Sequence, residues 1–143
     1  NDAVEEALAF GWIDSTIHKL DDDRYAQRFT PRRPGSPYSE PNLVRLRAMA
    51  RRGKIPRDVL ARVRPLLAVK PFRVPPDILA ALKADPEIWA NFRAFSDTYK
   101  RIRIAYIDGA RAHPEIFAKR LSHFLAKTKR NLLIGFGGIQ KHY

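Results

Sequence analysis

The stretch WIDSTIHKLDDDRYAQRFT, residues 12–30, decides the fold class. Its side chains alternate with a period of two on both sides of the aspartates 21–23, which supply turn chemistry. We therefore expect a β-hairpin that ends at Pro31, because proline cannot continue a hydrogen-bonded ladder. A two-stranded ribbon is only marginally stable alone, so it needs cover from a third strand or a helix.

Helical patterns dominate the rest of the chain. Asp2 and Glu5 have the spacing of a capping box, and Gly11 ends that first helix. Further helices are expected over residues 39–52 and 56–64, then near 76, 86, 96 and 114, where prolines or Ser96 mark the starts. The sequence thus predicts an α+β, predominantly helical fold, with a short antiparallel sheet near the N-terminus and a C-terminal bundle of three or four helices.

The length of 143 residues predicts a single domain over residues 1–143. Its expected parts are a helix and hairpin over 1–38, a helical hairpin over 39–67, and a helical part with a docked tail over 76–143. Leu133, Phe136 and Ile139 are the apolar contacts expected to hold that tail. The start without Met, directly on a helix, predicts an N-terminally truncated chain whose missing part holds a further strand and any signal peptide.

The net charge of +12 is unevenly distributed. Residues 1–23 carry −6, residues 24–73 carry +12 and residues 74–143 carry +6. Between residues 24 and 64 there are eleven arginines and one lysine, and the planar arginine fork suits phosphate and carboxylate groups. A composition-biased genome, with arginine stems covering helix surface, explains the same bias without a ligand. The asymmetry itself indicates an anionic partner.

Signatures of catalysis are scarce. The chain has no cysteine, and its four histidines lack the spacing of a zinc-protease motif. The adjacent aspartates 21–23 lack the alternation of a calcium loop, and the glycines 135–138 have no following helix to bind a phosphate. We expect no catalytic residue, metal or cofactor, while an enzyme with an unrecognised acid–base pair stays open. The apolar stretches are too short to span a membrane.

The two helices on either side of Gly53 also have the outline of a helix-turn-helix, with Arg57 and Arg62 near the start of the second. Pro65 shortens that helix, and helical hairpins are common in helical cores without any DNA. Nucleic-acid binding through the basic segment 24–64 is therefore the alternative function.

Residues 2–15 (DAVEEALAFGWIDS) and 20–33 (LDDDRYAQRFTPRR) resemble the YdeI/OmpD-associated family, also called bacteriocin-protection proteins. Residues 102–111 (IRIAYIDGAR) and 136–143 (FGGIQKHY) are similar to that family's helical C-terminal region, so the resemblance covers essentially the whole chain. It implies a cytoplasmic bacterial protein linked to resistance against bacteriocins or antimicrobial peptides. The family supplies no catalytic residues to carry over.

The resembling motif places a candidate ligand site on the hairpin, the loop and the following helix cap. Its residues are Trp12, Asp14, Arg24, Tyr25, Arg28, Thr30, Arg32, Arg33, Ser36, Ser39 and Asn42. We expect the guanidinium groups of the ribbon and the proline-rich bend to converge on one anion pocket beside the helix start at Ser39. Alternatively, Asp14 pairs with Arg24 or Arg28 across the hairpin, while Trp12 and Phe29 are core residues.

The sequence therefore predicts a non-enzymatic stress or bacteriocin-protection protein. Its expected partner is an anionic small molecule or an acidic macromolecule, bound through the hairpin and loop arginines. A homodimer stays open, because exposed apolar residues cannot be located from the sequence.

Overall fold

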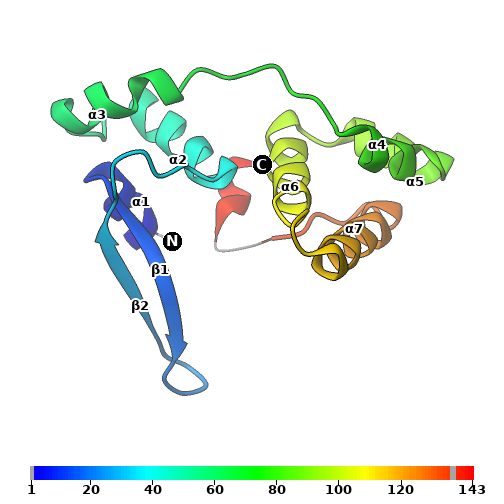
Figure 1. Ribbon diagram of the computed structural model, residues 1–143, viewed down its shortest axis with the longest axis horizontal. Helices are drawn as coiled ribbons and strands as arrows, with labels where there is room; N and C mark the ends of the chain where they lie inside the picture. Colours follow the sequence, from blue (N-terminus) through cyan, green and yellow to red (C-terminus); the bar gives the residue numbers. More distant parts are fainter. Residues whose placement is uncertain (1, 136–137) are drawn as a thin grey trace. The chain divides into compact units, whose positions relative to one another are not determined.

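The computed structural model describes residues 2–135 and 138–143 (Figure 1), without the side chain of Asp2. The chain forms two compact units, unit 1 (Asn1–Val69) and unit 2 (Lys70–Tyr143), which are described separately. The expected α+β, predominantly helical fold is confirmed. The single domain over 1–143 stays a prediction, and the capping contact expected from Asp2 lies outside the described side chains.

Unit 1 begins with helix α1 (Asp2–Ala9), followed by the antiparallel strands β1 (Trp12–Lys19) and β2 (Tyr25–Pro31). Gly11 has φ +75°, which lets the chain reverse between α1 and β1. The hairpin and its end at Pro31 are confirmed. The regular alternation is interrupted by an irregularity between Asp14 and Ile17, which sequence periodicity does not reveal.

The ribbon is exposed over most of its length. Figure 1 shows its two strands extending from α1. Trp12 is 41% exposed and Tyr25 is 63% exposed, so the alternative that made Trp12 a core residue is wrong. The described residues of this sheet form two strands, and α1 packs against β1 at one end. The cover that a ribbon needs therefore comes from a helix at its base.

The core of unit 1 lies between α1, helix α2 (Glu40–Arg51) and helix α3 (Arg57–Val63). The buried apolar residues of this core are Leu8, Ala9, Leu46, Met49, Ile55, Val59 and Val63. Gly53 has φ +66° and turns the chain from α2 toward α3, as expected for a helical hairpin. Pro65 lies in the 3₁₀ turn η1 (Arg64–Leu66), which ends α3 after seven residues.

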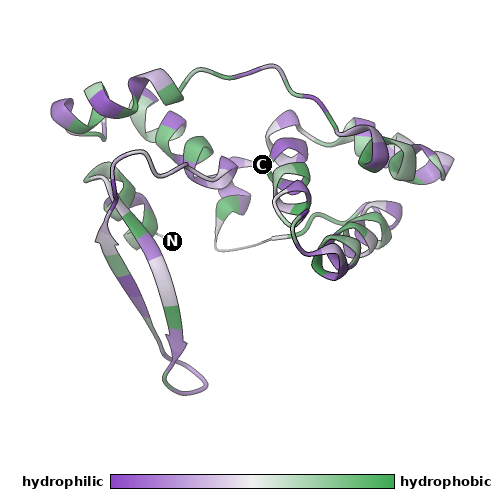
Figure 2. Cartoon of the chain, viewed as in Figure 1, coloured by the Kyte–Doolittle hydropathy of each residue, from purple (hydrophilic) through white to green (hydrophobic). Residues whose placement is uncertain are grey.

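Unit 2 is built from four helices: α4 (Pro76–Lys83), α5 (Pro86–Ala94), α6 (Asp97–Asp108) and α7 (Pro114–Lys129). Asp85 caps α5, and the Ser96 hydroxyl caps α6 by accepting a hydrogen bond from Tyr99 N at 3.2 Å. The buried core residues are Ile78, Leu82, Ile88, Phe92, Tyr99, Ile104, Ile107 and Phe124. Hydrophobic and hydrophilic residues alternate around these helices (Figure 2), which is typical of helices with one buried face.

The C-terminal tail follows α7 through Asn131, whose φ of 52° ends the helix. The second 3₁₀ turn, η2 (Ile139–His142), buries Ile139 as expected. Leu133 is 53% exposed, so its expected docking contact is wrong, and Phe136 lies outside the described residues. Ile134 and Tyr143 instead pack against the core of unit 2.

Candidate anion-binding surface

Arg24 lies at the tip of the ribbon and is already paired with a carboxylate. Its Nε and Nη2 atoms are 2.7 and 2.6 Å from Asp21 Oδ2. Asp21 Oδ1 also accepts a hydrogen bond from Arg24 N at 2.7 Å. The hydrogen bond from the Arg24 side chain lowers the pKa of Asp21 below its ordinary value. The charge of Arg24 is therefore neutralised within the turn.

The length of β2 separates the predicted arginines from one another. Arg24 comes directly before β2 and Arg32 directly after it. The eight residues between their positions correspond to about 26 Å at the rise of an extended strand. One small anion cannot contact both. Arg28 lies mid-strand, exposed, and its side chain has no polar partner in the described part of the chain. The structure thus does not bring the ribbon arginines together in one pocket.

The expected pairing of Asp14 with an arginine is also absent. Asp14 Oδ2 accepts a hydrogen bond from Gln27 Nε2 at 3.4 Å, across the ribbon. Arg24 is bonded to Asp21, and Arg28 offers only its carbonyl, which accepts from Ser15 Oγ at 3.2 Å. The alternative that paired Asp14 with Arg24 or Arg28 is therefore wrong.

Arg32 holds the loop after the hairpin. Its guanidinium carbon lies 3.6 Å from the centre of the Tyr38 ring, and Nη2 donates to the carbonyls of Ser36 (3.4 Å) and Pro37. Its Nε and Nη1 atoms are buried and have no acceptor among the described residues. Arg33, the next residue, is exposed and has no polar side-chain partner there. The predicted pair therefore divides into a structural Arg32 and an accessible Arg33.

At the start of α2, the predicted polar residues serve the fold. Ser39 is the N-cap of α2, but its side chain makes no capping bond. Asn42 is buried and its Oδ1 atom accepts a hydrogen bond from Arg45 Nη1 at 3.1 Å. Arg47 Nη1 is 2.9 Å from Glu40 Oε1, so the charges of these two side chains compensate each other at the first turn of α2.

Thr30, another of the predicted site residues, is half-buried in β2 and lies opposite Ile13 of β1 in the register.

A different group of cations is exposed and unpaired. We call it the basic edge; it consists of Arg51, Arg52, Lys54, Arg57 and Arg64. It follows the end of α2, the turn at Gly53, α3 and η1. All five side chains are exposed, and none has a hydrogen bond or an ion pair within residues 2–135 and 138–143.

The helix pattern explains why these cations face outward. Leu46, Met49, Val59 and Val63 take the buried positions of α2 and α3, so the basic residues between them are left on the outer faces. Residues 51–64 contain six basic residues and one acid. That acid, Asp58, is 3.4 Å from the Nη2 atom of the sixth base, Arg62. Residues 51–64 therefore contain no further carboxylate that could pair with the five residues of the basic edge.

Two members of the basic edge share a hollow on α3. Arg57 and Arg64 are seven residues apart and line it together with Leu60 and Ala61. Residues spaced by three, four and seven lie on one side of a helix, so the two guanidinium groups flank the same short face. Sequence reasoning gave the ribbon arginines more weight than these helix arginines. The signal that could have found the basic edge is the dense run from Arg51 to Arg64 with a single acid.

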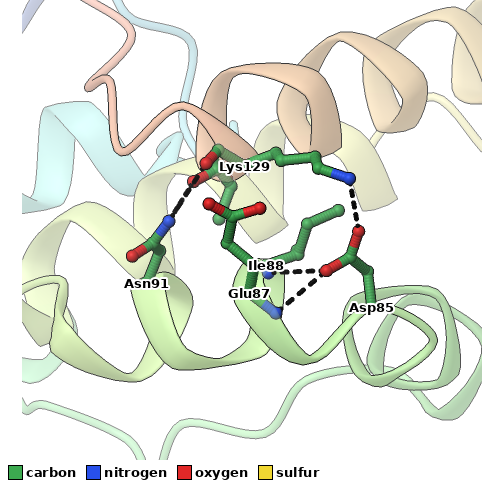
Figure 3. Close-up of polar contacts among 6 residues, drawn as sticks. Asp85, Glu87, Ile88, Asn91 and Lys129 are labelled. Atoms are coloured by element: carbon green, nitrogen blue, oxygen red, sulfur yellow. Dashed lines mark hydrogen bonds and ion pairs between the residues drawn. The ribbon is translucent and has the colours of Figure 1, made fainter.

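In unit 2, several cations have carboxylate partners. Lys129 Nζ lies 2.8 Å from Asp85 Oδ2 (Figure 3), and Asp85 Oδ1 accepts from Glu87 N at 2.9 Å and Ile88 N at 3.3 Å. The side-chain hydrogen bond from Lys129 lowers the pKa of Asp85, and the same contact raises the pKa of Lys129. Asn91 Nδ2 donates to Lys129 O at 3.2 Å, which ties α5 to the end of α7.

Arg111 carries a second such network. Its Nη1 and Nη2 atoms are 3.0 and 2.9 Å from the two carboxylate oxygens of Asp77, and Nε is 2.5 Å from Asp108. These bonds raise the pKa of Arg111 and lower that of Asp77. A bidentate arginine–carboxylate pair has its donors occupied, so Arg111 is not available to a ligand.

One buried arginine of unit 2 has tyrosines in place of a carboxylate. Arg103 Nη2 donates to the Tyr143 hydroxyl at 2.9 Å, and its guanidinium lies within 6.0 Å of the rings of Tyr99, Tyr106 and Tyr143. The Nε atom is buried without an acceptor among the described residues. Burial raises the pKa of Tyr99. These contacts hold the end of the chain against α6.

In the described ranges, no three His, Cys, Asp or Glu side chains lie close enough together to hold a metal ion. No described helix is long and apolar enough to cross a bilayer.

Comparison with known families divides the chain at the same place as the structure. Residues 71–131 match the family described as "Bacteriocin-protection, YdeI or OmpD-Associated" (OmdA). Unit 2 carries an OmdA domain. The family resemblance seen in the sequence is thereby confirmed for residues 71–131, and its expected extent over essentially the whole chain is not. Residues 1–62 match a second family, DUF8412, a domain of unknown function. No curated protein and no solved structure is significantly similar to this chain.

The two matches place the candidate surface and the OmdA resemblance in different parts of the chain. The segment 102–111, quoted for the resemblance, lies inside the OmdA domain, whereas 2–15 and 20–33 lie in the DUF8412 match. The predicted hairpin site and four residues of the basic edge also lie in the DUF8412 match. Arg64 follows two residues after it. The candidate surface therefore lies outside residues 71–131, the part of the chain that matches the OmdA family.

Proposed function

We propose that this OmdA-domain protein is a non-enzymatic binding protein of the bacteriocin-protection type, and that unit 1 binds an anionic partner through the basic edge. One observation carries the proposal. The five exposed cations of the basic edge have no carboxylate partner among the described residues, while Arg111 and Lys129 in unit 2 are paired. A cytoplasmic location belongs to the same proposal.

The physical reason is the free energy of uncompensated like charge. Neighbouring cations repel one another, and this repulsion destabilises the compact state. An anionic partner removes the repulsion and releases the counterions that otherwise surround the cations. Four of the five residues are arginines, whose fork can hold two oxygens of a phosphate or a carboxylate. The basic edge thus supplies both charge and hydrogen-bond geometry.

The hairpin and loop residues named from the sequence remain a prediction. Arg28 and Arg33 are exposed and unpaired in the described structure, so they support a contribution to the same partner. Arg24 is engaged by Asp21 and Arg32 by Tyr38, which removes the support for a contact through either of them. The proposed surface is therefore centred on α2 and α3 rather than on the ribbon.

Titration with inorganic polyphosphate tests the proposal. We expect the double variant R51A/R52A to bind polyphosphate at least about tenfold more weakly than the unmodified chain, because two contacts are lost. The control K19A/R24A removes the same charge from two cations that are paired with Asp22 and Asp21, and we expect a change below threefold. Equal losses for the two variants, or no polyphosphate binding at low salt, would overturn the proposal.

A further inference from the structure

The apolar and aromatic side chains around the basic edge indicate which class of anionic partner it binds. Stable protein–protein interfaces have an apolar core and are enriched in exposed aromatic anchors. Every residue from 26 to 65 is described, and none of the large apolar side chains in this range is exposed. Leu66, which lies in η1 at the end of the basic edge, is 46% exposed and is the one large apolar side chain exposed beside it in the range 26–66. Leu60 is half-buried in the hollow of α3, and Ala61 beside it is small. A surface of this composition is typical of a nucleic-acid interface, which is more polar and more positive.

Single-stranded nucleic acid is disfavoured by the same surface. Proteins that bind single strands stack the bases on exposed aromatic rings. The aromatic side chain that the loop places before α2 is Tyr38, and the Arg32 guanidinium covers its ring at 3.6 Å. A base cannot stack on that covered face. The partner that needs cations without a stacking platform is a duplex, whose bases are already stacked and whose phosphates face outward.

The turn at the centre of the basic edge is open to a close approach. A Cβ atom placed on Gly53 would have nothing within 4 Å, so the backbone between Arg52 and Lys54 is uncovered. Arg57 and Arg64 continue the cationic surface along α3. Residues 51–64 contain no Asn or Gln to read adenine edges. The seven-residue α3 carries two arginines that could read guanine edges, and one of them, Arg62, is paired with Asp58.

The ribbon does not compete for the same role. A two-stranded ribbon fits the major groove of DNA in size. The tip of this ribbon, however, carries Asp21, Asp22 and Asp23, all exposed. Asp21 and Asp22 bind the nearby cations Arg24 and Lys19, and Asp23 adds a further negative charge. The tip therefore offers phosphates no free cation, and the ribbon is not the element that enters a groove.

We infer that the basic edge binds the phosphate backbone of duplex nucleic acid, largely without reading its sequence. This inference rests on the proposed function and names the partner class for the same surface. Five phosphate contacts give a slope of about −4.5 for log K against log salt, hence an affinity loss of about 500-fold between 50 and 200 mM salt. R51A/R52A lowers the slope by about 2 units, equally for duplexes of unrelated sequence.

Fluorescence anisotropy with the full chain tests this. The probes are two 20-base-pair DNA duplexes of unrelated sequence, one of their single strands, and a polyglutamate peptide of equal charge. We expect both duplexes to bind within threefold of each other and at least tenfold more tightly than the other probes. K19A/R24A is the matched control, and circular dichroism verifies that each variant is folded.

The outcomes separate the two proposals. If polyglutamate or the single strand binds as tightly as the duplexes, the duplex inference is wrong and the proposed function stands. If one duplex is preferred more than a hundredfold, the sequence-independent mode is wrong. If no probe binds at 50 mM salt, the proposed function itself fails.

Discussion

Replacing Tyr143 by phenylalanine removes one oxygen from the contact that joins the chain's end to α6. This hydroxyl accepts a hydrogen bond from Arg103 Nη2 at 2.9 Å and donates one to Ile134 O at 2.8 Å. The Tyr99 ring lies 4.8 Å from the Tyr143 ring, edge to face, and the Tyr99 hydroxyl accepts from Ile134 N at 3.1 Å. The Y143F variant keeps the ring contact and loses these two hydrogen bonds.

The size of the effect follows from these two bonds. A hydrogen bond to a charged group contributes about 1.5–3 kcal/mol and one between neutral groups about 0.5–1.5 kcal/mol. Both contacts of the Tyr143 hydroxyl are partly buried, so water reaches the freed groups in part. The two contributions sum to about 2–4.5 kcal/mol, and partial access of water favours the lower end. We therefore expect Y143F to lower the free energy of unfolding by about 2 kcal/mol.

Urea unfolding followed by Trp89 fluorescence measures this loss. The chain has two tryptophans, so a W12F background leaves Trp89, which stacks on Phe92 at 5.9 Å in unit 2. The matched control is Y106F, because Tyr106 is 53% exposed and its hydroxyl has no partner in the described structure. We expect the control to change stability by less than about 0.5 kcal/mol. Equal effects of Y143F and Y106F would refute the reasoning.

Three further predictions concern stability. L46A removes a fully buried side chain of unit 1 and should cost about 2–5 kcal/mol in urea unfolding, whereas L66A, at an exposed position, should cost far less. D85A should be less stable than D85N at neutral pH, since asparagine keeps the α5 cap and loses only the bond to Lys129; equal stabilities would contradict the capping role. The pKa of Asp85 is lowered in the folded state, so its contribution to the free energy of unfolding is complete above about pH 5 and is lost as the pH falls through that lowered value. The difference in the free energy of unfolding between D85N and the unmodified chain should therefore vanish in acid.

The elements that local chemistry specifies could be predicted from the sequence. Alternation and the three aspartates gave the hairpin, Ser96 gave the start of α6, and Gly53 gave the turn between α2 and α3. Each of these signals acts over a few residues and is visible in a single sequence. The irregularity between Asp14 and Ile17 has no such signal, because it depends on how the two strands pair.

The site was harder to predict, because the state of an arginine depends on what the fold places beside it. The sequence alone does not show the partners of Arg24, Arg32 and Arg57. The structure gives Arg24 a carboxylate, stacks Arg32 on Tyr38 and leaves Arg57 exposed. The pairing of Arg24 with Asp21, three residues earlier, was within reach of local reasoning. The burial of Arg103 among tyrosines depends on Tyr143, forty residues away, and no local pattern reveals it.

The central claim is that the unpaired cations of the basic edge, and not the paired ones, meet the anion. Two-dimensional NMR of the arginine Nε–H and backbone amide groups during a polyphosphate titration tests it most directly. The account predicts shifts at Arg51, Arg52 and Arg57, with the carboxylate-bound Arg24 and Arg111 unchanged. Shifts confined to Arg24 or Arg111, or spread evenly over all arginines, would contradict it.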